Sequence, residues 1–491
     1  MTMIPVGPWL PDLPALANPG ALEALNVIPD AASYRPLPAF AEQGNAMAAR
    51  VQGAIYARGV GGTIAQFAGD GTKLYRWDSS GVNWQDVSRI AGGAYATPTD
   101  GGWSFAQFGD LVIAVNGTDV SQKYTVGSSA NFEPLSGSPP VGRLVATVRD
   151  FVVMGRIAAT VNRVQWSGIN NAETWTPSQA TQADFQDLPD GGYVMGLVGG
   201  EYGVVFQERS IKRMTYVGVP LVFQFDEVAR GIGTPAEGSV ARYEDMAFFL
   251  SDEGFYALAG AQQLRGIGQN KVDRFFWNDV NQSHLHRISS AVDPVNKLYV
   301  VSYPSAASVN GTPDKLLIYS WQTDRWSRAE QPLALLHQGA SQASYTLEGL
   351  DSISTNLDAL PFSLDSRAWT GAGRLLLGGF SIANRAGFFS GQPMAAVVDT
   401  GESQLLEGSR TLVRGVRPLA DGGTPSVALG YRNRLSDEVQ WGPDVAQNDR
   451  GACPQRASAR YFRARLKIPA GQSWTHLQGI DEIDAAPAGR Q

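Results

Sequence analysis

The sequence of 491 residues lacks the features that mark several large classes of protein. It contains a single cysteine, Cys453, which excludes an internal disulfide and a cysteine-based metal cluster. The first ten residues do not combine a basic segment with an apolar one, so they do not resemble a secretory signal peptide. No apolar run approaches the roughly 20 residues that a membrane-spanning helix needs. The single cysteine is most simply explained by synthesis in a reducing compartment.

Charged residues are also scarce, at 17%, and the formal net charge is −7. We do not expect the main role of such an acidic chain to be tight binding of nucleic acid, because electrostatic attraction to nucleic acid depends on clustered Lys and Arg. Passage of nucleic acid along an acidic surface remains compatible with this charge. Hydrophobic residues make up 43%, which permits a large core.

Residues that carry chemistry are few and do not form familiar motifs. Of the four histidines, His284 and His286 could share one strand face, but no ligand with metal-site spacing stands nearby. The sequence has no nucleophile elbow, no zinc-protease helix motif and no phosphate-binding loop. The adjacent carboxylates of Asp252 and Glu253 would point to opposite faces of a strand, unlike the paired acids of a glycosidase. We therefore expect no catalytic residue, no metal and no cofactor.

What the sequence does contain is a repeated strand–turn–strand unit, first seen whole from Thr63 to Val87. Strands at 63–68, 72–77 and 82–87 are joined by turns rich in Gly, Asp and Ser. Similar units recur at intervals of about 40 to 50 residues, which is the period of propeller blades. The repeats begin at Ile64, Ser104, Leu144, Val194, Val240, Ile288 and Leu335. The pattern predicts an all-β fold with a β-propeller of six to eight blades over residues 51–391, and tryptophans that fill the gaps between blades.

The first 50 residues differ from the repeats in being rich in proline and yet apolar. Proline rules out a continuous helix or strand, so we expect an extended arm over residues 1–50 that lies on its own surface or on a neighbour's. A frayed terminus is the alternative. Residues 21–26 could form one or two helical turns. Deletion of residues 1–40 is predicted to leave the propeller folded and to impair assembly. The candidate partner-interface residues are Trp9, Leu10, Pro11, Leu13, Leu22 and Tyr34.

Beyond about Gly391 the repeat is lost and longer strands follow, which predicts a separate β-sandwich-like domain over residues 392–487. Its densest basic run consists of Arg460, Arg463, Arg465 and Lys467. Three of these side chains would share one strand face and could contact phosphate or an acidic partner. A solvated sandwich face explains the same pattern. The clearest helical segment, residues 271–280, lies in a connection between repeats.

Three stretches resemble the tail-nozzle proteins, also called packaged-DNA stabilisation proteins, of short-tailed bacteriophages. The first is the opening of the chain, from Gly7-Pro8-Trp9-Leu10-Pro11-Asp12-Leu13-Pro14 to Tyr34-Arg35-Pro36. The others are Phe249-Leu250-Ser251-Asp252-Glu253-Gly254-Phe255-Tyr256 and Lys271-Val272-Asp273-Arg274-Phe275-Phe276. The resemblance covers the arm and the repeat region, and these motifs are structural rather than catalytic.

The resemblance implies a structural virion protein of the phage tail, made and assembled in the bacterial host cytoplasm. Such proteins form a homo-oligomeric, commonly hexameric, ring below the tail adaptor and portal, with tail fibres or a needle as further partners. The ring retains packaged double-stranded genomic DNA and conducts it at ejection, without sequence-specific binding or membrane insertion. The alternative is a propeller enzyme or lectin that acts on host surface carbohydrate.

Overall fold

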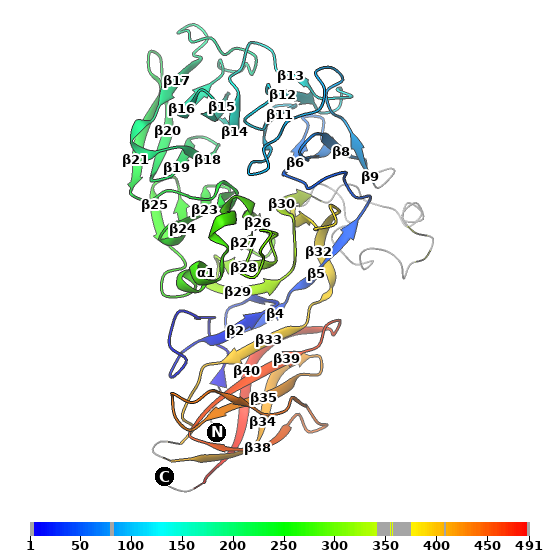
Figure 1. Cartoon of the computed structure of the whole chain (residues 1–491), viewed down its shortest axis with the longest axis vertical. Helices are drawn as coiled ribbons and strands as arrows, with labels where there is room; N and C mark the ends of the chain where they lie inside the picture. The colour runs from blue at the N-terminus through cyan, green and yellow to red at the C-terminus, as the bar shows by residue number, and fades with distance from the viewer. Residues whose placement is uncertain are drawn as a thin grey trace.

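The computed structural model describes residues 4–78, 83–340, 354, 356, 375–406 and 409–488. The fold is all-β and consists of a propeller ring and a sandwich of two sheets, with the N-terminal arm between them (Figure 1). The turn predicted after Asp78 lies outside the described residues. The fold class predicted from the sequence is therefore confirmed.

Within the described residues, the ring contains six separate four-stranded sheets and a seventh set of four strands that continues outward into the sandwich. Each set of four strands is antiparallel. Its strands run outward in chain order from an innermost strand, except that one set takes its outermost strand from the arm. The innermost strands are β6 (Gly53–Arg58), β10 (Ser104–Phe108), β14 (Gly142–Val148), β18 (Val194–Val198), β22 (Ala241–Tyr243), β26 (Ser289–Asp293) and β30 (Leu335–Ala340). The second strands are β7 (Ile64–Gly69), β11 (Leu111–Val115), β15 (Phe151–Ile157), β19 (Gly203–Gln207), β23 (Met246–Ser251), β27 (Leu298–Tyr303) and β31 (Leu375–Phe380).

The outer half of each sheet follows the same order. The third strands are β8 (Leu74–Asp78), β12 (Gln122–Thr125), β16 (Thr160–Trp166), β20 (Ser210–Gly218), β24 (Gly254–Ala259), β28 (Lys315–Ser320) and β32 (Ala386–Pro393). The outermost strands are β9 (Asn83–Asp86), β13 (Glu133–Pro134), β17 (Asp184–Asp187), β21 (Val222–Arg230), β25 (Gln263–Gly266), β29 (Arg325–Glu330) and β5 (Pro38–Gln43). The last of these, β5, comes from the arm, so the two ends of the repeat region close the ring in one sheet.

Hydrophobic clusters fill the spaces between neighbouring sheets, because each sheet must bury both faces against the next. Tryptophans occupy several of these spaces, as predicted. Trp77 and Trp84 meet edge to face with ring centroids 5.3 Å apart, between the first sheet of the ring and the sheet that β5 closes. Trp166 is 2% exposed and packs between the β14–β17 and β18–β21 sheets.

The sandwich joins the ring through a shared sheet. From the outer edge of β29 the sheet continues through β2 (Ala21–Leu25), β33 (Ala396–Thr400), β39 (Tyr461–Ile468) and β35 (Ser426–Arg432), with β36 (Gln440–Trp441) and β37 (Val445–Ala446) at its end. The facing sheet consists of β1 (Ile4–Pro5), β3 (Val27–Pro29), β4 (Tyr34–Pro36), β34 (Thr411–Gly422), β38 (Cys453–Ala459) and β40 (Trp474–Pro487).

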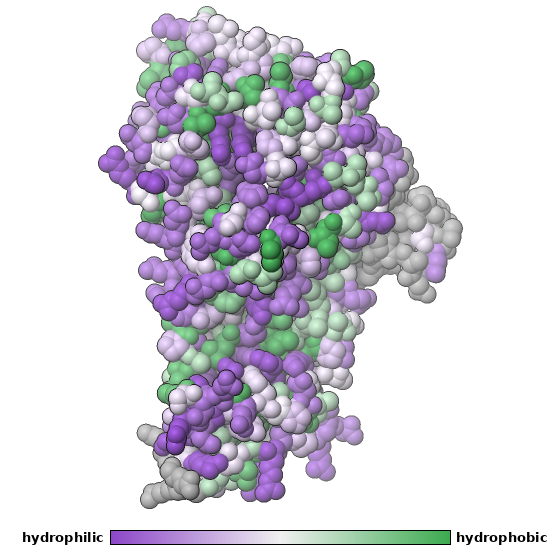
Figure 2. Space-filling view, viewed as in Figure 1, coloured by the Kyte–Doolittle hydropathy of each residue, from purple (hydrophilic) through white to green (hydrophobic). Residues whose placement is uncertain are grey.

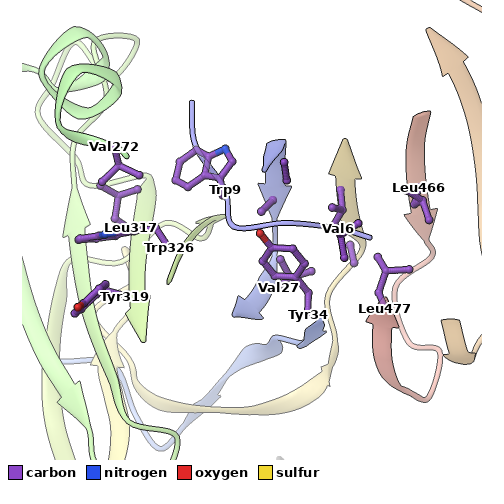
Figure 3. Packing of buried hydrophobic residues seen from close by; sticks show 14 of the residues in the cluster. Val6, Trp9, Val27, Tyr34, Val272, Leu317, Tyr319, Trp326, Leu466 and Leu477 are labelled. Atoms are coloured by element: carbon purple, nitrogen blue, oxygen red, sulfur yellow. The ribbon is translucent and has the colours of Figure 1, made fainter. Parts of the chain in front are cut away.

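The arm forms the joint between the two bodies and contributes to both. The single α-helix of the described part, α1 (Asp273–Asp279), lies within the predicted segment and packs on this joint, and short 3-10 helices precede two innermost strands, η2 (Glu237–Ser239) and η3 (Gln282–Arg287). A third short helix is η1 (Pro189–Gly191). Figure 3 shows Val6, Trp9, Val27 and Tyr34 of the arm between Trp326 on the ring side and Leu466 and Leu477 on the sandwich side. The core is therefore continuous from ring to sandwich.

Two predictions about the arm are wrong. Residues 21–25 form strand β2 rather than helical turns, because β29 and β33 offer open strand edges on its two sides. The propeller is also not independent of residues 1–40, since β5 begins at Pro38 and is the outermost strand of a blade. The arm is extended, as expected, but it is built into the chain's own sheets.

Candidate functional site

A cavity of about 470 Å³ opens at the end of the ring where the innermost strands begin. We call it the mouth. Its lining comes from the residues at, or just before, the starts of β6, β10, β14, β22, β26 and β30, together with side chains from β15 and β18. A second cavity of about 430 Å³ shares Ser104, Phe105 and Glu237 with the mouth and continues along the innermost strands. The two cavities share lining residues, and we call the pair the channel of the ring.

One side of the mouth holds a closed cluster of charges. Glu237 in η2 accepts a hydrogen bond from Arg143 Nε at 2.9 Å and a second from Arg156 Nη1. Arg156 lies at a β-bulge of β15, where its φ of 51° is in the left-handed region. A bulge redirects a side chain, and here it brings a residue of a second strand into the mouth. The Arg156 guanidinium also stands 5.4 Å from the Tyr193 ring centroid.

The other side of the mouth holds an open cluster. Arg50 comes just before β6 and donates a hydrogen bond from Nη2 to the Thr99 carbonyl at 2.8 Å. Arg287 ends η3, and its Nε is buried without a hydrogen-bond partner. Burial and the neighbouring Arg287 lower the pKa of Arg50 to about 10, and burial lowers the pKa of Arg287. In the part of the chain that the structure describes, no ion pair joins either arginine to a carboxylate.

His286 lies at the exposed rim beside the open cluster. Burial, His284 and Arg287 lower the pKa of His286, although Asp100 acts in the opposite direction. The rings of His284 and His286 are 5.6 Å apart. Among the described residues, no group of three His, Cys, Asp or Glu side chains could hold a metal ion.

The two carboxylates of the mouth do not form a pair of acids. Glu237 is bound to two arginines, whereas Asp100 is exposed and stands beside His286. A glycosidase needs two carboxyl groups that face one bond from opposite sides, one of them with a raised pKa. The arrangement instead presents guanidinium groups, which suit recognition of carboxylate or phosphate.

The predicted interface residues of the arm lie at the joint. Trp9 and Tyr34 are 1% and 0% exposed and pack within the chain's own core, so neither is available to a partner in this structure. Leu10 is also buried, at 9%. The remaining three, Pro11, Leu13 and Leu22, are half-buried.

The predicted basic run begins just before β39 and lies next to Trp441 of β36, and two of its four charges are compensated by carboxylates. Arg465 donates from Nε and Nη2 to Asp399, both at 2.7 Å, and Lys467 donates to Asp444 at 2.7 Å. The guanidinium groups of Arg463 and Arg465 lie over the Trp441 ring, 4.8 and 4.1 Å from its centroid. Arg460 is half-buried at the end of β38. Contact with phosphate or a partner stays a prediction.

The arginines of the mouth were not predicted. Their sequence positions are far apart, and no motif links them. The register of the repeats is the one signal that could have found them, because Arg143 and Arg287 each stand immediately before a predicted repeat start, Leu144 and Ile288.

The fold and the mouth define the chain as a propeller fused to a sandwich, with an arginine-rich opening to its channel. No protein-family model matches the sequence, and no curated protein is significantly similar to it. Among solved structures, the computationally designed protein Ika8 is similar over 67% of this chain and 93% of its own, with 9% identity and a TM-score of 0.36. The extracellular domain of BT4673 from B. thetaiotaomicron is similar over 82% of this chain and 47% of its own, with 12% identity and a TM-score of 0.39. Likenesses of this extent identify neither a family nor a function. In the described residues, no helix is both long enough and apolar enough to span a membrane.

Proposed function

We propose that the chain is a structural subunit of the tail nozzle of a short-tailed bacteriophage. In this proposal it forms a hexameric ring in the virion tail, below the adaptor and portal. The ring surrounds packaged double-stranded DNA, retains it, and conducts it at ejection. Fibres or a needle would attach to the same ring.

The observation that carries this proposal is that the three stretches of the sequence resemblance meet at the joint. The Trp9 and Phe275 rings contact edge to face with centroids 5.0 Å apart. Asp12 accepts hydrogen bonds from the backbone N–H groups of Arg274 and Phe275, at 2.9 and 2.7 Å, and so caps α1 from the arm. Phe255 packs against Phe276 with centroids 4.9 Å apart. The three segments that each resemble the same family are thus in contact with one another, which supports a fold shared with that family.

The joint also gives the subunit the rigidity that a ring around a conduit requires. Arg328 of β29 donates from Nε and Nη2 to Glu23 of β2, both at 2.7 Å, with side-chain exposures of 14% and 23%. Tyr34 donates its hydroxyl to the Gly7 carbonyl at 2.9 Å. Because ring and sandwich share one sheet and one core, they would move as one body under load.

A non-enzymatic role fits the chemistry of the mouth, in which one carboxylate is held by two arginines. The net charge of −7 fits passage of DNA without sticking at ejection, because electrostatic attraction to DNA depends on clustered Lys and Arg.

The experiment is light scattering and negative-stain electron microscopy of the purified full-length chain, alone and with the tail adaptor. We expect a six-fold ring with a central opening of duplex width. A chain that remains monomeric in both conditions and cleaves a surface glycan would overturn the proposal in favour of a propeller enzyme.

A further inference from the structure

The mouth carries an excess of positive charge that the composition of the chain does not predict. Four guanidinium groups and two carboxylates line it, whereas the whole chain has a formal net charge of −7. Positive charge is therefore concentrated in this cavity. The mouth is a small-molecule site in size, because ligand pockets range from about 300 to 1,000 Å³ and the mouth measures about 470 Å³.

The excess of positive charge lies on the side of the mouth that holds Arg50 and Arg287. Glu237 neutralises part of the charge of Arg143 and Arg156 and fixes their positions. Arg50 and Arg287 face the same cavity. Burial lowers the pKa of both arginines, and the charge of Arg287 lowers the pKa of Arg50 further. Donor groups are left over, among them the buried Nε of Arg287. A buried cation is costly unless it is paired and hydrogen-bonded. An anion between the two arginines would relieve their repulsion and accept charge-assisted hydrogen bonds from both.

We propose that Arg50 and Arg287 bind the oxyanion group, carboxylate or phosphate, of a small organic ligand that enters the mouth. The rest of the ligand lies against the half-buried side chain of Phe105, whose ring stacks on the buried Trp103 ring with centroids 6.2 Å apart at 27°. His286 at the rim supplies a further hydrogen-bonding group. This site goes beyond the proposed nozzle function, since a ring subunit that only surrounds DNA needs no small-molecule pocket.

The test is calorimetric titration of the full-length chain with inorganic phosphate, with glucuronate, and with glucose as the uncharged counterpart of glucuronate. We expect phosphate, glucuronate or both to bind, and glucose not to bind. Binding of phosphate alone identifies a phosphate ester, and binding of glucuronate alone identifies an acidic sugar. Arg50→Gln and Arg287→Gln should each weaken binding at least tenfold. Arg58→Gln, at the far end of the strand β6 that Arg50 precedes and outside the mouth, should leave binding unchanged.

Equal binding of glucose and glucuronate, no binding of either anion, or unchanged binding by Arg287→Gln would overturn the proposal. Arginine labelling of the unaltered protein with phenylglyoxal provides a test that does not depend on variants that fold. Phosphate should protect Arg50 and Arg287 and leave Arg58 reactive, as read by peptide mass spectrometry. Equal labelling of all three with and without phosphate would also overturn it.

Discussion

Replacement of Trp9 by alanine tests whether the arm belongs to the chain's own core or to a partner. Trp9 is 1% exposed, its ring meets Phe275, and its Nε1 donates to the Leu22 carbonyl at 3.2 Å. Loss of a buried tryptophan ring costs about 3 to 5 kcal/mol. The unpaired carbonyl adds about 1 kcal/mol. We therefore expect Trp9→Ala to lower the free energy of unfolding by about 4 to 6 kcal/mol, which is a large part of the roughly 5 to 15 kcal/mol that stabilises a typical domain.

The assay is urea denaturation followed by circular dichroism, together with the rate at which a thiol reagent labels Cys453 of the sandwich. Because Trp9 and Cys453 belong to one core cluster, Trp9→Ala should speed up labelling. Trp166→Ala removes an equally buried ring from a cluster on the far side of the propeller, so it should destabilise the chain without that acceleration. Pro14→Ala, at an exposed position of the arm, should change the stability by less than about 0.5 kcal/mol. A cost for Trp9→Ala as small as that of Pro14→Ala would refute the assignment of the arm to the joint.

Three further outcomes follow from the joint and the sandwich. Glu23→Gln, which removes the bidentate partner of Arg328, should lower stability by about 1 to 3 kcal/mol in urea denaturation, and no loss would mean that solvent replaces the pair. Burial raises the pKa of Asp273 to about 6 from an ordinary value of 3.8. Between pH 3.8 and about 6 the folded state therefore keeps a proton on Asp273 that the unfolded state has lost, and the stability of the fold falls as the pH rises through this range. Asp273→Asn should therefore raise the melting temperature at pH 7 and leave it nearly unchanged at pH 4, and an equal effect at both would contradict the raised pKa. Cys453 is 0% exposed and burial raises its pKa, so a thiol reagent should label it only at the rate at which the sandwich opens, and immediate labelling of native protein would contradict this.

The repeat was predictable because the strand and turn residues that define each blade lie close together in the sequence. Ser104, Val194 and Leu335 are the first residues of innermost strands, as the spacing predicted. Ile64 is instead the start of a second strand. The innermost strand before it, residues 53–58, is separated from it by a glycine-containing loop and was not identified. Local signals therefore identified the blades but not the boundaries of the first one.

The closure of the ring and the mouth were not predictable in the same way, because both depend on residues distant in sequence. Strand β5 pairs with β32 at the other end of the repeat region, and the local pattern of residues 38–43 does not indicate which strand it pairs with. Residues 21–25 have good helix formers, yet two open strand edges determine their conformation. The mouth arises where the starts of several strands converge. Arg143 and Arg156 are neighbours within one sheet, but Arg50 and Arg287 come from different sheets and meet only once the ring has closed.

The joint and the mouth differ in whether their basic side chains have acidic partners. This difference indicates a structural role for the charges at the joint and a ligand-binding role for those at the mouth. Around the joint, three basic groups have acidic partners: Arg328 has Glu23, Lys315 has Asp279 at 2.8 Å, and Lys271 has Asp324 at 2.7 Å. Such pairs hold elements together because neither charge is left without compensation. At the mouth, Arg50 donates to the Thr99 carbonyl, but neither Arg50 nor Arg287 forms an ion pair with a described carboxylate, so their positive charge is not compensated. Among the described residues, the joint thus contains compensated charge pairs, whereas the mouth holds two arginines without an acidic partner. This is the arrangement expected if the missing partner is an anion that arrives from outside.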